Sequence, residues 1–299
     1  MRRTLVLLIR IAAEDAVHNV HVKKLYPHST PLNRSLKKMK DKNIKIPAAK
    51  APPLASIKKA TTAELTAKRF TEKLKSFQSD EELKKIQRYF KSGEGQYGEG
   101  DQFIGVRMGQ VFELAKAFFE MPIAEIEKLL ESPIHEIRAG AVSIMDKAAR
   151  SKKITESRKK EFFDLYIRRH DRINNWDLVD LGSLHMTGSY LFDKPRAILY
   201  KLVRSKNLWE RRSAIISTCY FIRQGDINDT FKIAENLLCD KEDMVHKASG
   251  WMLRFAGSKD SKKLLEFLDK YAAQMPRTML RNSIEQLSKK QKEHYLKMK

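Results

Sequence analysis

Four segments of the chain recur at a nearly constant spacing, and this restricts the possible folds more than any other feature of the sequence. They begin at positions 136, 173, 210 and 245, so the intervals are 37, 37 and 35 residues. The first segment carries an apolar stripe along one helical face, formed by Ile137, Ala141, Ile144, Met145 and Ala148. No stretch of the sequence sustains the alternation of period two that is typical of strands. We therefore expect an all-α fold from about residue 61 onward.

The spacing also predicts how these helices are arranged. Two-helix units of this size stack into α-solenoids of the HEAT or armadillo kind, in which equivalent positions of successive units line one concave groove. Basic residues at such equivalent positions are Arg138, Arg212 and Lys247. About one turn further along their helices lie Trp176, Asp180, Trp251 and Arg254. The sequence thus predicts an α-solenoid of HEAT-like repeats with a basic concave groove.

The charge of the chain indicates a polyanionic partner. Lys and Arg number 59 against 37 Asp and Glu, which gives a net charge of +22. Such an excess is typical of proteins that bind nucleic acid, and an acidic membrane surface is the competing partner. The apolar stretch Thr4–Ile9 is shorter than a secretory signal segment and far shorter than the roughly 18 residues of a spanning helix. We therefore expect a cytoplasmic protein without membrane association, located at the nucleoid if the source is prokaryotic.

Residues 1–60 differ in composition from residues 61–299. They hold 14 Lys and Arg but only 3 Asp and Glu, five of the nine prolines and no glycine. A segment of this kind buries too little apolar surface to offset the entropy lost on ordering. We expect a basic, disordered N-terminal arm over 1–60 and a repeat domain over 61–299. The arm is either a nonspecific DNA tether or localisation signal, or a solvated extension without function.

Trp176 and Asp180 lie four residues apart in the stretch NNWDLVD, so a helix places the indole and the carboxylate on one face. The structural interpretation is that Trp176 packs in the core and Asp180 pairs with a lysine. The functional interpretation rests on the surrounding charge. A carboxylate in a basic groove weakens binding to a polyanion, so it is useful there only if it meets a cation.

Other residues give no sign of a metal, a nucleotide or a redox cofactor. The glycine-rich loop 93–100 follows a helix rather than a strand and lacks the Gly-Lys-Ser/Thr of a phosphate-binding loop, so we interpret it as a mobile connector near DNA. Cys219 and Cys239 fall within apolar helical patterns and are expected to be core thiols. No ligand spacing is formed by His135, His170, His185 and His246. We therefore expect no cofactor.

Five short motifs in order along residues 61–299 resemble the HEAT-repeat alkylpurine DNA glycosylases, the AlkD-type DNA alkylation repair family. The motifs are Tyr89–Lys91, the loop Gly93–Asp101 with the following Phe103–Val106, the WDLVD segment, Trp209–Ala214 and Lys247–Arg254. The resemblance implies that Asp180 is the catalytic carboxylate and that Trp176 and Trp251 wall the sugar and base of the lesion. It further implies that Tyr89 is another aromatic of the site and that Arg212 contacts the DNA backbone. From the repeat register, we expect Arg138, Lys247 and Arg254 to contact DNA as well.

The chemistry of this family agrees with a single carboxylate. Glycoside hydrolysis normally uses one carboxyl group to protonate the leaving group and a second to assist the attack. A purine alkylated at N3 or N7 is already cationic and leaves as a neutral base, so one carboxylate is enough to stabilise the sugar cation and align water. We expect a monomeric, monofunctional glycosylase that releases 3-methyladenine and 7-methylguanine from duplex DNA. The alternatives are a non-catalytic HEAT-repeat scaffold and a binder of bent or branched DNA.

Overall fold

The computed structural model describes residues 57–90 and 92–298, and within them the expected all-α fold is confirmed. These residues contain no strand, only one isolated parallel bridge between Gln102 and Ile134. Most of the expected basic arm lies outside the described residues. Its last residues are described, and Ala60 is buried and donates its N–H to the carbonyl of Ala117.

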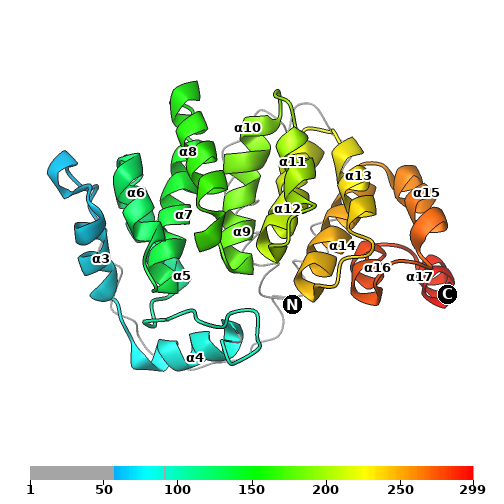
Figure 1. Ribbon diagram of the computed structural model, residues 1–299, viewed down its shortest axis with the longest axis horizontal. Coiled ribbons are helices and arrows are strands. Elements are labelled where there is room, and N and C mark those ends of the chain that lie inside the picture. Colours follow the sequence, from blue (N-terminus) through cyan, green and yellow to red (C-terminus); the bar gives the residue numbers. More distant parts are fainter. Residues whose placement is uncertain (1–56, 91, 299) are drawn as a thin grey trace, which may run out of the picture. The chain divides into compact units, whose positions relative to one another are not determined.

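Six helices pack one against the next in chain order and form the first of two rows (Figure 1). They are α5 (Met108–Ala117), α7 (His135–Ala149), α9 (Trp176–Gly182), α12 (Leu208–Arg223), α14 (Asp243–Gly257) and α16 (Arg277–Ser283). The four segments with regular spacing become α7, α9, α12 and α14. The repeat therefore predicted correctly which helices are neighbours.

The second row of helices packs on the first. It contains α6 (Ile123–Leu130), α8 (Glu156–Arg168), α10 (Ser189–Leu191), α11 (Ala197–Leu202), α13 (Asn228–Asn236) and α15 (Ser261–Tyr271). The remaining elements are η2 (Thr62–Glu64), α3 (Ala67–Lys75), α4 (Asp80–Phe90), η3 (His170–Arg172), the π-helical η4 (Ser183–Gly188) and α17 (Lys289–Lys297).

Capping residues set where the helices begin and end. Asn175 and Asn207 accept N–H groups at the starts of α9 and α12, as asparagine commonly does at this position. Pro122 and Pro276 precede α6 and α16. Gly225, with φ at +89°, ends the turn after α12. Asparagine, proline and glycine residues thus mark ends of α6, α9, α12 and α16.

The core lies between the two rows, and α7 is buried along almost its whole length. The apolar stripe of α7 is confirmed, with Ile144 and Met145 fully enclosed. Cys219 is a core thiol as expected, but the expectation for Cys239 was wrong because that side chain is exposed. The helix α13 ends at Asn236, so the helical pattern that suggested burial stops before Cys239. No helix among the described residues has the length and apolar character needed to cross a lipid bilayer.

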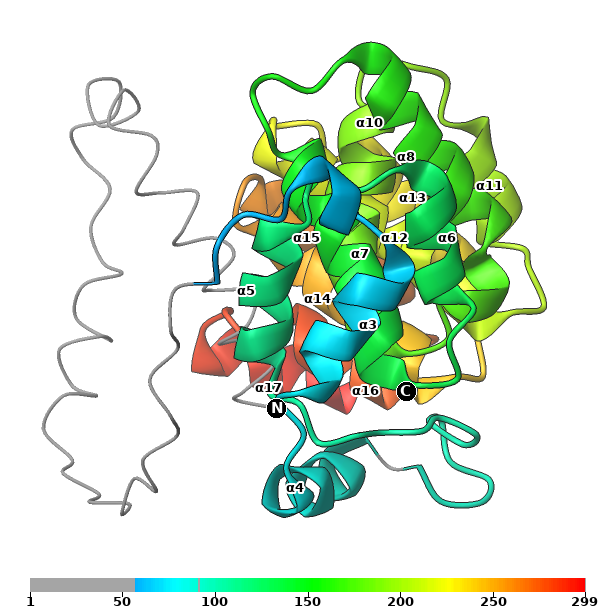
Figure 2. The ribbon, with the colours of Figure 1, turned by 90° about the vertical axis from the view of Figure 1, so that its left-hand side faces the viewer.

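The helix α4 and the glycine-rich loop lie beside the ends of the first row (Figures 1 and 2). The base of this loop is held by Glu136, whose carboxylate accepts the backbone N–H groups of Ile104, Gly105 and Val106 at 2.9–3.3 Å. Gly105 has φ at +79°, and a Cβ there would lie 2.2 Å from the carbonyl oxygen of Ser79. The segment after the loop is therefore fastened to the start of α7, and the mobility expected for residues 93–100 stays a prediction.

Candidate functional site

Asp180 and Arg212 form a buried, bidentate ion pair between α9 and α12. Arg212 Nε donates to Asp180 Oδ1 at 3.0 Å, and Nη2 donates to Oδ2 at 2.9 Å. Nη1 of the same guanidinium donates to the carbonyl of Met244 at the start of α14. The two residues are 3% and 5% exposed. The pair therefore joins three successive helices of the first row.

The protonation of Asp180 depends on this pair. Burial raises the pKa of the Asp180 carboxyl, and the charge and hydrogen bonds of Arg212 oppose that shift. A bidentate guanidinium is the strongest partner that a side chain can offer a carboxylate. The net effect is a pKa of Asp180 above its ordinary value, with Arg212 as the group that favours the ionised form.

Trp176 is the first residue of α9, one turn before Asp180, and it is 7% exposed. Its ring meets Tyr89 edge-on with centroids 5.8 Å apart, and it stacks on Phe90 at 5.8 Å. Tyr89 is one of the most exposed large hydrophobic side chains, at 43%. The structure thus brings together the two aromatic residues Tyr89 and Trp176, which the sequence places far apart.

The glycine-rich loop contributes a further aromatic residue to this surface. The Tyr97 hydroxyl donates to the backbone carbonyl of Tyr89 at 3.3 Å. The Tyr97 ring lies edge-on to Trp209 of α12, with centroids 6.5 Å apart. The loop therefore lies across the ends of α4 and α12. Tyr97 lies within the Gly93–Asp101 motif, and its aromatic type in a glycine-rich loop is the signal that could have identified it.

Three of the expected site residues belong to α14, namely Lys247, Trp251 and Arg254. Trp251 is half-buried, and Lys247 pairs with Asp243 at 2.6 Å. Arg254 pairs with Glu285. None of the three has a described polar or ring contact with Asp180 or Trp176. The carbonyl of Met244 links α14 to the Asp180–Arg212 pair, because it accepts a hydrogen bond from Arg212. Met244 lies one helical turn before Lys247.

Arg138 is enclosed by protein at the start of α7. Its side chain is 3% exposed, and its Nη2 pairs with Asp101 Oδ1 at 2.5 Å. Nη1 donates to the carbonyls of Ser132 and Pro133 at 2.9 and 3.0 Å. The contact of Arg138 with DNA stays a prediction, and in the described structure its guanidinium faces protein groups.

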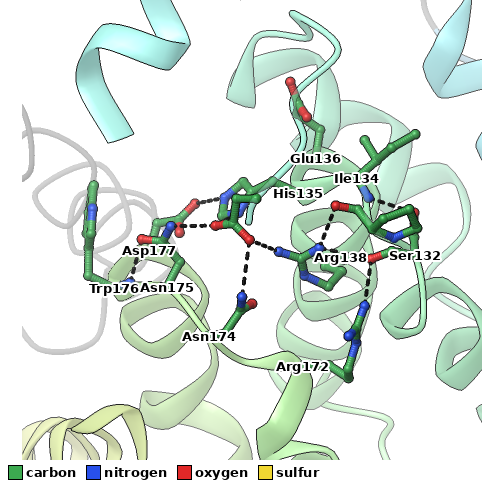
Figure 3. A network of polar contacts seen from close by, with 12 residues as sticks. Ser132, Ile134, His135, Glu136, Arg138, Arg172, Asn174, Asn175, Trp176 and Asp177 are labelled. Atoms are coloured by element: carbon green, nitrogen blue, oxygen red, sulfur yellow. Dashed lines mark hydrogen bonds and ion pairs between the residues drawn. The ribbon is translucent and has the colours of Figure 1, made fainter. Parts of the chain in front are cut away.

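Asp101 is shared by His135 and Arg138 in one polar network. Figure 3 shows this network from close by, with His135 and Arg138 labelled. Besides Arg138, the Asp101 carboxylate accepts the side-chain amides of Asn174 at 3.1 Å and Asn175 at 2.8 Å. His135 Nδ1 lies 3.3 Å from the same carboxylate, and His135 Nε2 lies 2.8 Å from Asp177 Oδ2. The imidazole is therefore held between two carboxylates.

The charges of this network reinforce one another. Burial disfavours the His135 cation, but Asp177 and Asp101 outweigh it and raise the pKa of His135 to about 9. Burial would also raise the pKa of Asp101, but His135 and Arg138 lower it to about 2. Among the described residues, no group of His, Cys, Asp and Glu is arranged to hold a metal ion.

Comparison with known protein families shows which family the chain belongs to. The sequence profile described as DNA alkylation repair enzyme matches residues 70–287, which is most of the chain. The chain belongs to the DNA alkylation repair enzyme family. The match covers every helix from α4 to α16 and both the Asp180–Arg212 pair and the Asp101 network. The protein is therefore a member of a family of DNA repair enzymes, and the family implies DNA as its substrate.

A solved structure supports the fold of this family member. It is described as "Predicted DNA alkylation repair enzyme from Enterococcus faecalis", and it is 17% identical in sequence. The TM-score is 0.56, and the likeness covers 71% of this chain and 97% of the other. A comparison with curated protein sequences gives no significant match. At this identity the solved structure supports the arrangement of helices alone.

Proposed function

We propose that this DNA alkylation repair protein is a monofunctional glycosylase that hydrolyses the N-glycosidic bond of cationic N3- and N7-alkylated purines in duplex DNA. 3-Methyladenine and 7-methylguanine are the expected substrates, and Asp180 is the proposed catalytic carboxylate. The observation that carries the proposal is the placement of Asp180: it is buried, paired with Arg212 and one helical turn from the indole of Trp176.

The chemistry assigned to Asp180 requires it to be ionised. Cleavage of the glycosidic bond gives the sugar positive charge, and the alkylated base leaves as a neutral molecule without help from an acid. A carboxylate in a water-poor site stabilises that charge more strongly than it would in bulk water. Arg212 favours the ionised form, and its hydrogen bonds hold both oxygens in place. Asp180 would stabilise the sugar cation and align the attacking water.

The aromatic residues suit a cationic base. A cation over an aromatic face gains about 0.5–2 kcal/mol, with tryptophan the best of the three aromatic types. Tyr89 is exposed and lies edge-on to the largely buried Trp176, and we propose that the two rings form a wall for a planar ligand, which would reach it at Tyr89. We assign Trp251 of α14 to the same site as a second wall. A neutral, undamaged purine would gain less from such walls.

Phosphate contacts would hold the DNA without reading its sequence. Arg212 uses three N–H groups in its described contacts, and a guanidinium has further donors for a phosphate. Lys247 and Arg254 of α14 are paired with the acidic residues Asp243 and Glu285. A phosphate could replace either carboxylate. We propose that these residues belong to the basic concave groove of a HEAT-like solenoid, and that the protein acts as a monomer in the cytoplasm.

The alternative is a non-catalytic HEAT-repeat protein that binds DNA or serves as a scaffold. In that case the Asp180–Arg212 pair would only join α9, α12 and α14. The test is release of methylated bases from duplex DNA treated with a methylating agent, with wild type compared with Asp180→Asn. We expect the wild type to release both purines and leave uncut abasic sites. Release that is equal in the Asp180→Asn variant would refute the catalytic role of Asp180.

A further inference from the structure

The geometry points to Asp101 as a positioning residue that, through Asn175 and His135, fixes the aromatic wall of the lesion site. This inference rests on the proposed function, because the wall matters only if Trp176 and Tyr89 meet the lesion. Asp101 itself would touch neither DNA nor the base. It acts from behind the wall, at the junction of the glycine-rich loop with α7 and α9.

The first step is the connection from Asp101 to the start of α9. Asn175 donates its side-chain amide to Asp101 at 2.8 Å, and its side-chain oxygen accepts the backbone N–H of Trp176 at 2.8 Å. Asn174 donates to the other carboxylate oxygen at 3.1 Å. Asp101 therefore holds the two residues that immediately precede Trp176, and α9 begins where these hydrogen bonds place it.

The second step is the fixation of α9 from the other side of Trp176. Asp177 follows Trp176, and its carboxylate lies 2.8 Å from His135 Nε2. The opposite ring nitrogen of His135 lies 3.3 Å from Asp101. Asp101, His135 and Asn175 thus form a bracket around the backbone of Trp176. All three side chains are buried, so water does not compete for these contacts.

The third step is a stack of rings that extends the bracket to the wall itself. Phe90 lies with its ring centroid 4.8 Å from that of His135 and 5.8 Å from that of Trp176. Phe103 stacks on Phe90 at 5.1 Å and lies 5.0 Å from His135. Since Tyr89 precedes Phe90 in α4, the imidazole supports both aromatic residues of the wall.

The network is more elaborate than the cap of a short helix requires. An N-cap asparagine accepts one of the free N–H groups at a helix start and commonly does so without a second side chain behind it. Here one carboxylate is shared by an arginine, a histidine and two asparagines from three parts of the chain. Buried polar networks restrict the geometry of the groups that they hold, and sites of catalysis depend on placement to within a fraction of an ångström. The position of Asp101 directly behind Trp176 indicates that this geometry serves the site.

The chain contains a matched control for this network. Asp146, at the opposite end of α7, is also buried and also pairs with a histidine and an arginine. It lies 2.7 Å from His185 Nδ1 and 3.0 Å from Arg150 Nη2. Replacing Asp146 with Asn removes a buried carboxylate with the same types of partner, and none of these partners is Trp176 or Tyr89.

The experiment compares Asp101→Asn, Asn175→Ser and Asp146→Asn in the full chain. Serine at position 175 keeps a capping oxygen but loses the amide that reaches Asp101. Steady-state release of 7-methylguanine gives kcat and KM. In parallel, 19F spectra of protein labelled with 5-fluorotryptophan resolve the three tryptophans, and Trp176→Phe identifies the resonance of Trp176.

We expect Asp101→Asn and Asn175→Ser to lower kcat by about 10- to 100-fold with KM changed by less than about threefold, the pattern of a misplaced catalytic geometry. The Trp176 resonance should shift or broaden in both variants and stay unchanged in Asp146→Asn. An unaltered Trp176 resonance in Asn175→Ser, or an equal change in Asp146→Asn, would overturn the positioning role. Failure of the wild type to release any base would instead refute the proposed function. The Trp176 resonance in the variants would still show whether Asp101 positions Trp176.

Discussion

Asp180 and Arg212 are bound to each other through both carboxylate oxygens, at 3.0 and 2.9 Å, in a place where neither is more than 5% exposed. Removing one partner of such a pair leaves an uncompensated charge in the core. Substitution of either residue therefore changes folding as well as chemistry. Experiments on this site have to separate the two effects.

A double substitution separates them. Asp180→Leu alone should destabilise the protein by about 3–5 kcal/mol, because Arg212 loses its partner. Asp180→Leu combined with Arg212→Met should recover most of that loss, since apolar residues of similar volume commonly replace a buried pair without cost. Base release should be absent from both variants. Thermal unfolding and base release measure the two properties, and activity in the stable double variant would show that Asp180 is not catalytic.

The tryptophans make different contributions to stability. Trp176 is 7% exposed, so Trp176→Leu should cost both stability and activity. Trp251 is half-buried, and Trp251→Leu should leave the melting temperature nearly unchanged. If its indole faces the cationic base, the single-turnover rate on 7-methylguanine should fall by about 2- to 30-fold, the equivalent of one cation–π contact. Trp251→Phe should retain part of the rate. A wild-type rate in Trp251→Leu would remove Trp251 from the site.

The sequence predicted the helices and their neighbours because these depend on local patterns. The apolar stripe of α7 and the asparagines before α9 are signals within a few residues of the features they determine. The spacing NNWDLVD also placed Trp176 and Asp180 on one helix at the correct interval. These predictions needed no knowledge of what packs against each helix.

The partners of the charged side chains could not be predicted in the same way. Arg138 and Arg212 hold equivalent repeat positions, yet Arg138 turns to Asp101 and Arg212 turns to Asp180. A repeat register fixes a position on a helix and leaves open which acid from another part of the chain lies opposite. For the same reason, the sequence did not indicate that His135 lies between two carboxylates. Its partners Asp101 and Asp177 come from the loop after α4 and from α9.

Deletion of residues 1–56 should preserve the fold. The family match begins at residue 70, and Ala60 is the first residue with a described backbone hydrogen bond to a helix, so the deletion should end before it. The deleted segment carries 12 Lys and Arg against 3 Asp and Glu, and affinity for undamaged DNA should fall with that charge. Circular dichroism and DNA titration at fixed salt give the two readouts. Loss of the helical signal would place part of the fold in the deleted residues.

The groove can be tested with two lysines that each pair with an acid on their own helix. Lys247 of α14 and Lys262 of α15 each pair with an acid across one helical turn, but they belong to different rows. Lys247→Ala should weaken binding to damaged and plain duplex by similar factors. It should also reduce the slope of log affinity against log salt by about one unit, as expected of one phosphate contact. Lys262→Ala should leave the slope unchanged. Equal slopes for the two variants would place the DNA away from α14.

The imidazole of His135 should make stability fall at alkaline pH. Burial lowers the pKa of His135, but Asp177 from α9 and Asp101 from the loop after α4 outweigh it and raise this pKa to about 9. Arg138 lies on the same helix as His135 and pairs with Asp101. Between the ordinary pKa of about 6.5 and pH 9, the folded state keeps a proton that the unfolded state has released. The stabilisation by the cation is therefore complete below pH 6.5, declines above it and is lost as the pH rises through about 9.

His135→Gln is the variant that tests this titration, because glutamine can still hydrogen-bond to a carboxylate but carries no proton that titrates in this range. Urea unfolding at a series of pH values between 6 and 10 should show a decline in the free energy of unfolding for the wild type. The decline should be shallower in His135→Gln, whose overall stability is lower because Asp101 and Asp177 lose the cation between them. Identical slopes in the two proteins would mean that His135 is neutral in the folded state, and the bracket behind Trp176 would then rest on hydrogen bonds without the charge.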